Sequence, residues 1–226
     1  MEKRNFSEHL SKIQEEVLIG ILLGDGHLRS NKLYTKAALC VLQSEKNKDY
    51  LFHLYDIFKE FTLSPPKRYV FYDKRFPQKT YYRWSFTSRT LSCFQVYVTG
   101  AKGFYKVDTS CKKRIKILPW QIETMLTPRS IAYWYMDDGA QKWEKKSLGV
   151  RFCTDNFTLC EVLILISLLK HKYNLKSSTQ KKGGNYRIYI SSTSYFLLKN
   201  LIYVYLVPCM LYKFPVDSSD KTCEKT

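Results

Sequence analysis

The sequence predicts an α+β fold made of two halves related by pseudo-two-fold symmetry. A nine-residue apolar segment that ends in an acidic residue and glycine occurs twice, at 18–26 and at 131–139. Each copy is followed by polar, basic segments with strand-like alternation and then by an apolar helical segment. Because this order is the same in both copies, the pattern indicates an internal duplication of about 100 residues, not a solenoid repeat.

Corresponding residues of the two copies keep a spacing that shrinks steadily along the chain. The terminal aspartates Asp25 and Asp138 are 113 residues apart, whereas Lys116 and Lys213, near the ends of the copies, are 97 apart. The second copy is therefore a somewhat shorter version of the first.

The first half, assigned to residues 1–119, has an αββαββα-like order. Ser11 and Gln14 form a capping-box pattern that starts its first helix. The segments that follow are strands within 27–44, a helix at 49–61, strands at 69–72 and 81–86, a helix at 91–98 and a basic connector at 102–116 that ends at Pro119.

The second half, assigned to residues 120–226, repeats that order. Thr127 and Pro128 supply an N-cap and a proline at the first helical position. After the helix that ends at Asp138, we expect strands within 141–154, a helix at 159–173, a basic turn at 180–185, a strand at 186–190 and a terminal helix at 194–205. The two motif helices are predicted to pack together at the axis, and the basic strands to form two curved antiparallel sheets on one side.

The composition favours a polyanionic partner. Lys and Arg number 37 against 20 Asp and Glu, a formal net charge of +17, while 45% hydrophobic residues argue against a disordered chain. A membrane partner is disfavoured, because no apolar run reaches the roughly 18 residues that a spanning helix needs. The basic residues are also spread along the chain instead of massed on one amphipathic helix. Nucleic acid is the partner that this charge indicates.

The cysteines and histidines indicate neither a disulfide framework nor a zinc site. The seven cysteines are odd in number and dispersed without a C-x-x-C pair, and the four histidines lack metal-ligand spacing. This usage fits a reducing interior. The N-terminus has no signal-peptide apolar core, so we expect an intracellular protein that is not secreted.

The duplication has a chemical consequence at the helix ends. If the two motif helices pair side by side in parallel, Asp25 and Asp138 become neighbours at the bottom of their interface. Two carboxylates that close repel one another unless they share a proton or bind a cation. Hard oxygen ligands of this kind suit Mg²⁺, which also accepts substrate phosphates. These parts support metal-assisted hydrolysis of a phosphodiester.

The two segments LIGILLGDG and IAYWYMDDG resemble the signature of the LAGLIDADG homing endonucleases, in the monomeric two-motif type. The resemblance covers nearly the whole chain and includes LTPRS at 126–130, SPP at 64–66 and MLYKFP at 210–215. It implies a site-specific endonuclease that cuts both strands of a long, asymmetric double-stranded DNA target. The sheets would lie in the major groove, and the staggered cut would leave 3′ overhangs.

The resemblance also implies roles for individual residues. Asp25 and Asp138 would be the catalytic acids that bind Mg²⁺ or Mn²⁺, and Gly24 and Asp137 would offer backbone carbonyls to the metal. Three further residues would act at the periphery of the site by steering water or stabilising phosphate charge: Lys116, Lys213 and Gln43.

Two positions depart from the family pattern of small residues in the motif. Tyr133 stands where the first copy has Gly20, and Asp137 stands where it has Gly24. Close packing at the second helix is therefore expected to rely on Ala132, or the helices to tilt apart. Asp137 also competes with Asp138 for the catalytic role; we choose Asp138 because it directly precedes glycine, as Asp25 does.

Basic and aromatic residues of the strand-like segments are expected to face the DNA groove. Arginine can pair with guanine edges, whereas lysine contacts to phosphate carry affinity without sequence information. The residues nominated are Arg29, Lys36, Lys67, Arg68, Arg83, Trp143, Lys145, Arg151, Lys182 and Arg187.

Two alternatives to the endonuclease stay open. One is an RNA maturase that assists splicing of a group I intron, which would add intron RNA as a partner. The other is a DNA-binding regulator that kept the fold and lost catalysis, although both aspartates and both lysines are retained. For an intron-borne gene we expect a mitochondrial or chloroplast location.

Overall fold

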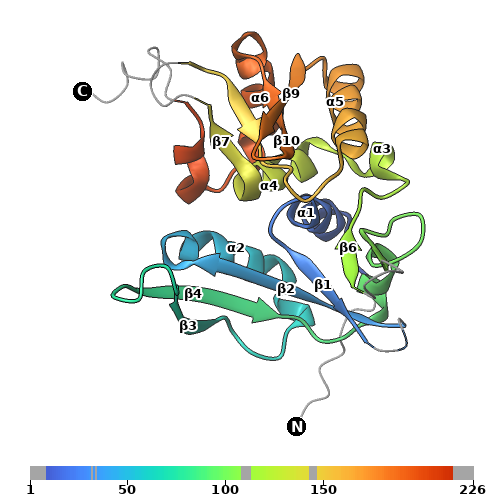
Figure 1. Ribbon diagram of the computed structural model, residues 1–226. Coiled ribbons are helices and arrows are strands. Elements are labelled where there is room, and N and C mark those ends of the chain that lie inside the picture. The colour runs from blue at the N-terminus through green and yellow to red at the C-terminus, as the bar shows by residue number, and fades with distance from the viewer. Residues whose placement is uncertain (1–8, 32, 34, 108–112, 143–146, 216–226) are drawn as a thin grey trace.

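The computed structural model describes residues 9–31, 33, 35–107, 113–142 and 147–215. Two halves lie one above the other in Figure 1, and helices α1 (Lys12–Leu23) and α4 (Pro128–Asp138) meet between them. Both helices begin with the predicted capping residues, since Ser11 and Thr127 each accept a hydrogen bond from the backbone N–H three residues on. The predicted pairing of the motif helices is thus confirmed.

Each half contains one four-stranded antiparallel sheet with an α-helix packed on it. In the N-terminal half the elements are β1 (His27–Ser30), β2 (Ala37–Ser44), α2 (Lys48–Phe58), β3 (Lys67–Tyr72) and β4 (Thr80–Thr87). In the C-terminal half they are β7 (Gly139–Gln141), β8 (Val150–Phe152), α5 (Leu159–Tyr173), β9 (Ser177–Lys182) and β10 (Asn185–Ile190).

The two sheets have the same topology. Their strand orders are β1-β2-β4-β3 and β7-β8-β10-β9. Helix α2 covers one face of the first sheet, where Phe52 meets Trp84 edge-on and Tyr55 meets Phe86. In the second sheet, Val150, Phe152, Ile188 and Ile190 alternate inward and are fully buried. This repetition confirms the α+β, pseudo-symmetric fold that the sequence predicts.

The remaining elements differ from the predictions in type more than in place. The helix expected at 91–98 is a 3₁₀ helix, Ser92–Tyr97, and the terminal helix α6 (Tyr195–Ile202) is shorter than expected. The connector forms a small hairpin, β5 (Tyr105–Val107) with β6 (Arg114–Lys116), and a short helix α3 (Ile122–Met125) follows it. A last 3₁₀ helix, Pro208–Lys213, carries Lys213 back to the centre of the molecule.

The α1–α4 interface is asymmetric. A Cβ on Gly20 would lie 2.6 Å from the Cβ of Tyr133, and a Cβ on Gly24 would lie 2.4 Å from the Cβ of Asp137. Gly20 of α1 and Gly24, which directly follows the helix, thus provide the space for both larger residues of α4. The expectation that close packing relies on Ala132, or that the helices tilt apart, is wrong for this reason.

The glycines that end the two motifs allow a close approach of the backbone, and they do not adopt a left-handed conformation. Among the described residues, the glycines with positive φ are Gly100, Gly183 and Gly184. Gly26 and Gly139 do not have positive φ. A Cβ on Gly139 would lie 2.3 Å from the carbonyl oxygen of Tyr135, and one on Gly26 would lie 2.9 Å from that of Ile21. At both positions the backbone returns too close to the helix end for any side chain.

Candidate active site and nucleic-acid interface

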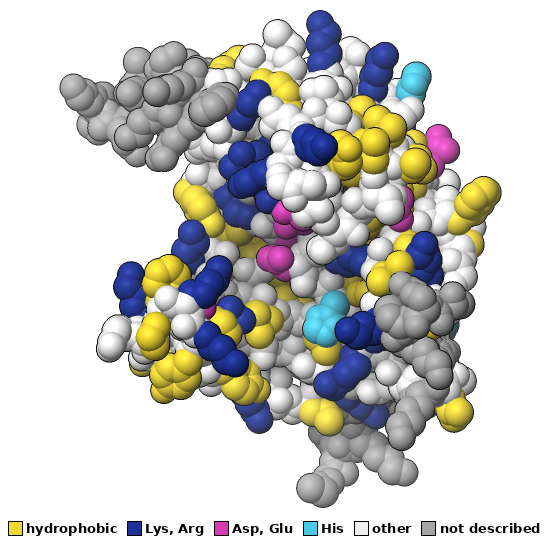
Figure 2. Space-filling model, viewed as in Figure 1, with side chains coloured by type: hydrophobic (Ala, Val, Ile, Leu, Met, Phe, Trp, Pro, Cys, Tyr) yellow, Lys and Arg dark blue, Asp and Glu magenta, His cyan; other side chains and the backbone are white. Residues whose placement is uncertain are grey.

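Acidic groups from both motif helices gather where the two halves meet. Asp25 follows the end of α1 and is exposed, whereas Asp138 is the last residue of α4 and is half-buried. In Figure 2, acidic side chains lie in the middle of this face with Lys and Arg side chains of both halves around them. The helix pairing therefore brings together two carboxylates that are far apart in sequence.

Asp137 links the two helix ends directly. The backbone N–H of Asp25 donates to Oδ2 of Asp137 (3.1 Å), across the space that Gly24 leaves open. The side-chain amide of Gln43 lies 3.5 Å from both Asp25 Oδ2 and Asp137 Oδ1. Gln43 thus touches the acidic cluster, as its predicted peripheral role requires, and Asn47 holds the far end of its amide through a 3.1 Å hydrogen bond.

Two half-buried lysines make equivalent contacts in the two halves. Lys116 Nζ donates to the carbonyl oxygen of Gly24 (2.7 Å), and Lys213 Nζ donates to that of Asp137 (2.6 Å). The residue after each of these carbonyls is Asp25 in one half and Asp138 in the other. The contacts therefore pair Asp138, and not Asp137, with Asp25.

Burial and like charge raise the pKa values of the C-terminal pair of carboxyls. Burial, and then the charge of Asp25, raise the pKa of Asp138 to about 7, although Lys116 and Lys213 act in the opposite direction. Burial first, and then the charges of Asp25 and Asp138, hold the pKa of Asp137 well above its ordinary range. Burial also lowers the pKa values of both lysines. Such a cluster favours a bound cation, which would relieve the repulsion.

The donors present fit a divalent cation only in part. Asp25 and Asp138 offer carboxylate oxygens, and the carbonyls of Gly24 and Asp137 each keep a second lone pair beside their lysine bond. No group of three or more His, Cys, Asp or Glu side chains with metal-ligand geometry occurs in the part of the chain that the structure describes. Mg²⁺ tolerates such a sparse set, because it retains waters and takes phosphate oxygens as ligands.

On the N-terminal sheet, three of the nominated residues share the face opposite α2. Register places Tyr69 opposite Arg83 and Lys67 opposite Ser85, while Arg29 lies on β1 and is exposed. Arg68 is paired with Trp84 and lies on the α2 face, where it bonds Glu45 (3.0 Å). The prediction that Arg68 faces the groove is therefore wrong, because adjacent strand residues point to opposite faces.

On the C-terminal sheet, Arg151, Lys182 and Arg187 share the face opposite α5. Arg187 forms an ion pair with Asp155 through two hydrogen bonds, one of 2.8 Å. Lys36 is exposed just before β2. Trp143 and Lys145 lie outside the described residues.

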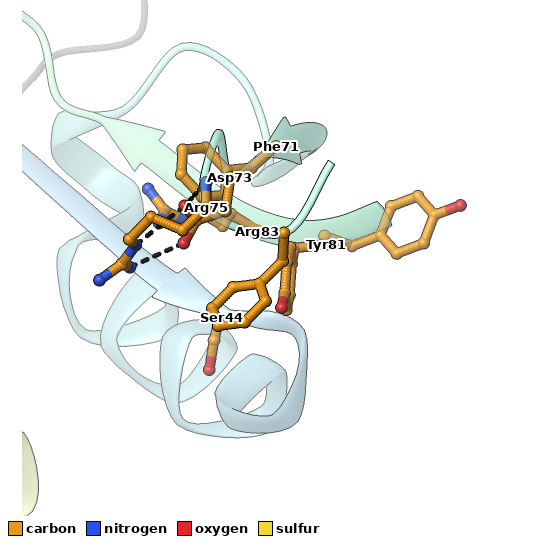
Figure 3. A pocket seen from close by; sticks show the side chains of 8 residues that line it. Ser44, Phe71, Asp73, Arg75, Tyr81 and Arg83 are labelled. Atoms are coloured by element: carbon orange, nitrogen blue, oxygen red, sulfur yellow. Dashed lines mark hydrogen bonds and ion pairs between the residues drawn. The ribbon is translucent and has the colours of Figure 1, made fainter. Parts of the chain in front are cut away.

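Three residues near these faces were missed by the sequence predictions. Lys142 lies 3.9 Å from the ring centroid of Tyr189, and Asp155 orients Arg187. Arg75 is paired with Asp73 beside Arg83, at a hollow shown in Figure 3. Lys142 and Arg75 could have been nominated from the sequence, because both are basic residues within predicted strand or turn segments. The pairing of Asp155 has no signal in the local sequence.

The profile of the LAGLIDADG DNA endonuclease family matches residues 15–198. The chain belongs to this family. It is 34% identical over 213 residues to the DNA endonuclease I-ChuI of Chlamydomonas applanata, covering 90% of this chain and 95% of that protein. It is 35% identical to the probable intron-encoded endonuclease 1 of Wickerhamomyces canadensis, covering 90% and 84% of the two chains. The family resemblance inferred from the motifs is confirmed.

The fold is also similar to that of a solved family member. The homing endonuclease I-WcaI, in a structure bound to its DNA recognition sequence, superposes with a TM-score of 0.79 and 30% identity. The match covers 92% of this chain and 89% of that one. A more distant relative is the cytochrome b mRNA maturase bI2 of Saccharomyces cerevisiae, 27% identical, with 87% of this chain and 46% of the maturase covered. None of the helices in the described residues combines the length and hydropathy needed to cross a bilayer.

Proposed function

We propose that this chain is an intron-homing endonuclease that cuts both strands of one long, asymmetric DNA site with Mg²⁺ or Mn²⁺. The observation that carries the proposal is the composite site, in which Asp25 and Asp138 lie at the ends of two packed helices and each follows a carbonyl that accepts from a half-buried lysine. The sequence similarity to intron-encoded endonucleases supports the same function. Since one chain contributes both halves of the site, it acts as a monomer.

A bound cation would be held by Asp25 and Asp138, and it would supply an activated water and neutralise phosphate charge. The chain's own side chains do the rest. Lys116 and Lys213 place positive charge beside the carboxylates, where the scissile phosphates would lie. Gln43 holds Asp25 and Asp137 through one amide and would orient the water that attacks. The two sheets follow the major groove on either side, so that the cuts are staggered across the minor groove and leave 3′ overhangs.

The first test removes the two acids. Asp25→Asn and Asp138→Asn are expected to abolish cleavage, while DNA binding survives or tightens because repulsion of phosphate is reduced. Cleavage is measured on a randomised DNA library with Mg²⁺ and with EDTA, and binding by gel shift. Asp56→Asn, on the exposed outer side of α2, is the matched control and should cut normally. Full Mg²⁺-dependent cleavage by the Asp25→Asn/Asp138→Asn double variant would contradict the mechanism.

A second candidate function is splicing of a host intron, which the similarity to a maturase favours. Retention of both aspartates and both lysines ranks it behind DNA cleavage and also argues against an inactive regulator. A splicing assay on a group I intron RNA with the double variant separates the two activities, because splicing that survives the loss of both acids cannot depend on DNA cleavage. An intron-borne gene would place the protein in a mitochondrion or chloroplast.

A further inference from the structure

The two sheets present different side chains at equivalent positions. The motif glycines Gly26 and Gly139 directly precede His27 and Ala140. His27 is opposite Cys40 in one sheet, and Ala140 is opposite Arg151 in the other. Cys40 and Arg151 are therefore equivalent positions on the exposed sheet faces.

The next strand extends this correspondence. Cys40 is opposite Thr87, and Arg151 is opposite Tyr189. Two residues earlier on those strands, and hence on the same faces, stand Ser85 and Arg187. The C-terminal sheet thus carries two arginines where the N-terminal sheet carries a thiol and a hydroxyl.

Both arginines keep guanidinium donors that no described residue accepts. Asp155 accepts from Nε and Nη2 of Arg187, which leaves Nη1 and the second Nη2 hydrogen as its remaining donors. The Nε atom of Arg151 is buried without a hydrogen-bond partner among the described residues. With Lys142 and Gln180 they line one hollow of about 350 Å³. A fixed guanidinium edge matches the paired acceptors O6 and N7 of guanine.

The equivalent positions of the N-terminal sheet are themselves uncharged, although Lys67 and Arg83 lie beside them on the same face. Leu42 lies opposite Ser85 and is 48% exposed. Cys40 and Thr87 form the adjacent pair. Apolar atoms in the major groove discriminate through the thymine methyl group, and they offer guanine no donor.

We propose that the two half-sites are read by different chemistry: guanine by Arg151 and Arg187 under the C-terminal sheet, and the thymine methyl of A·T pairs by Leu42 under the N-terminal sheet. This rests on the proposed function, in that both faces contact DNA. It deepens that function by stating which base class each half selects.

The test is a selection on DNA randomised across both half-sites, read once by binding in EDTA and once by cleavage in Mg²⁺. The wild-type protein should enrich guanine at two or more positions of one half and A·T pairs in the centre of the other. Arg187→Ser, which copies Ser85, should reduce one guanine preference by about 5- to 100-fold. Arg187→Lys keeps the charge and should lose the same preference, because lysine lacks the bidentate fork.

Further variants make the outcome decisive. Arg151→Gln should remove a second guanine preference, Leu42→Ala should weaken the A·T preference, and Lys170→Gln, on the exposed side of α5, should change neither. The proposal is overturned if Arg187→Ser weakens binding equally for all sequences, which marks a phosphate contact. It is also overturned if neither half enriches guanine. Base preferences that persist in EDTA while Mg²⁺ cleavage fails would support this proposal and contradict the catalytic one.

Discussion

Lys116 and Lys213 are half-buried lysines that contact backbone carbonyls at the helix ends. Burial alone would expel an ammonium group, yet each is held by a short hydrogen bond and by the charges of three nearby aspartates. Under the proposed function, a cation fixed beside the carboxylates would lie where negative charge develops when a phosphodiester is attacked. Their position therefore favours a catalytic contribution over a contribution to DNA affinity.

Replacing either lysine tests this position. Lys116→Met and Lys213→Met are each expected to lower the single-turnover cleavage rate by roughly 100-fold or more, in line with loss of one preorganised charge donor. Binding should change by only a few-fold. Single-turnover kinetics at saturating enzyme give the rate, and Lys170→Met serves as the control at an exposed site. A cleavage rate that falls by less than about threefold would contradict a catalytic contribution and would show that these lysines are ordinary surface charges.

His53 gives the folded state a pH dependence away from the acidic cluster. Its Nε2 lies 2.7 Å from the hydroxyl of Tyr133 on α4, and burial lowers its pKa, with Asp56 opposing. The unfolded chain then binds the proton more readily than the folded chain. The contribution of His53 to the free energy of unfolding is fully present above about pH 6.5, which is its pKa in the unfolded chain. It is lost as the pH falls through the lowered pKa of the folded state.

Urea unfolding of wild type and His53→Gln at pH 7.5 and 5.5 measures this linkage. Wild type should be the more stable protein at pH 7.5, and the difference in unfolding free energy should shrink at pH 5.5. Titration of other groups is common to both proteins and cancels in the comparison. A difference that stays constant or grows at pH 5.5 would contradict the assignment.

At the scale of elements, the α1–α4 contact decides the geometry of the site. Gly20 and Gly24 leave room for Tyr133 and Asp137, so the helix ends approach closely enough for Asp25 and Asp137 to hydrogen-bond. Had both helices carried small residues, the interface would be symmetric and Asp137 would not clamp the backbone of Asp25. The asymmetry thus gives the two aspartates different surroundings.

We expect Gly20→Ala to lower the free energy of unfolding, whereas the same change in most helix interiors raises it. In an open helix interior, alanine stabilises relative to glycine by about 1 kcal/mol. Here the new Cβ would lie 2.5 Å from the Ser130 carbonyl oxygen, and the neighbour is backbone that cannot rotate away. We expect a net destabilisation of about 1–3 kcal/mol, as for overpacking. Chemical unfolding measures it, and equal or higher stability of the variant would show that α1 and α4 are not in close contact.

At the scale of the whole molecule, positive charge is distributed over both sheets around a central acidic site. The formal net charge of +17 is not concentrated on one element, and Figure 2 shows Lys and Arg side chains on both halves of the viewed face. Such a distribution suits a duplex that crosses both halves. It also implies that many phosphates lose counterions when DNA binds.

Binding is therefore expected to weaken steeply with salt. For roughly 6–10 phosphate contacts, affinity should fall by roughly 10³- to 10⁵-fold between 50 and 200 mM salt. Fluorescence anisotropy with the Asp25→Asn/Asp138→Asn protein gives the slope without cleavage. Lys67→Gln should reduce the slope by about one unit without changing sequence preference. If DNA affinity does not change with salt concentration, the two sheets do not both lie along the groove in contact with many phosphates.

Much of this could be predicted from local sequence. The repeat of helix, strands and helix, the capping residues Ser11 and Thr127 and the aspartates at the helix ends all follow from patterns within short windows. Arg68 shows where that approach fails. Neighbouring residues of a strand point to opposite faces of the sheet, so the sequence allows either Lys67 or Arg68 to face the groove. The pairing of β3 with β4, together with the side that α2 covers, selects Lys67.

The sequence alone determined the duplication and the family, and it nominated the two acids, because each depends on residue types at fixed spacings. Tertiary structure decided how the two helix ends meet. Asp137 crosses to the backbone of Asp25 because Gly24 has no side chain, and Lys116 and Lys213 return to carbonyls 92 and 76 residues away. Contacts at such separations depend on how whole elements pack, and no local pattern records that packing.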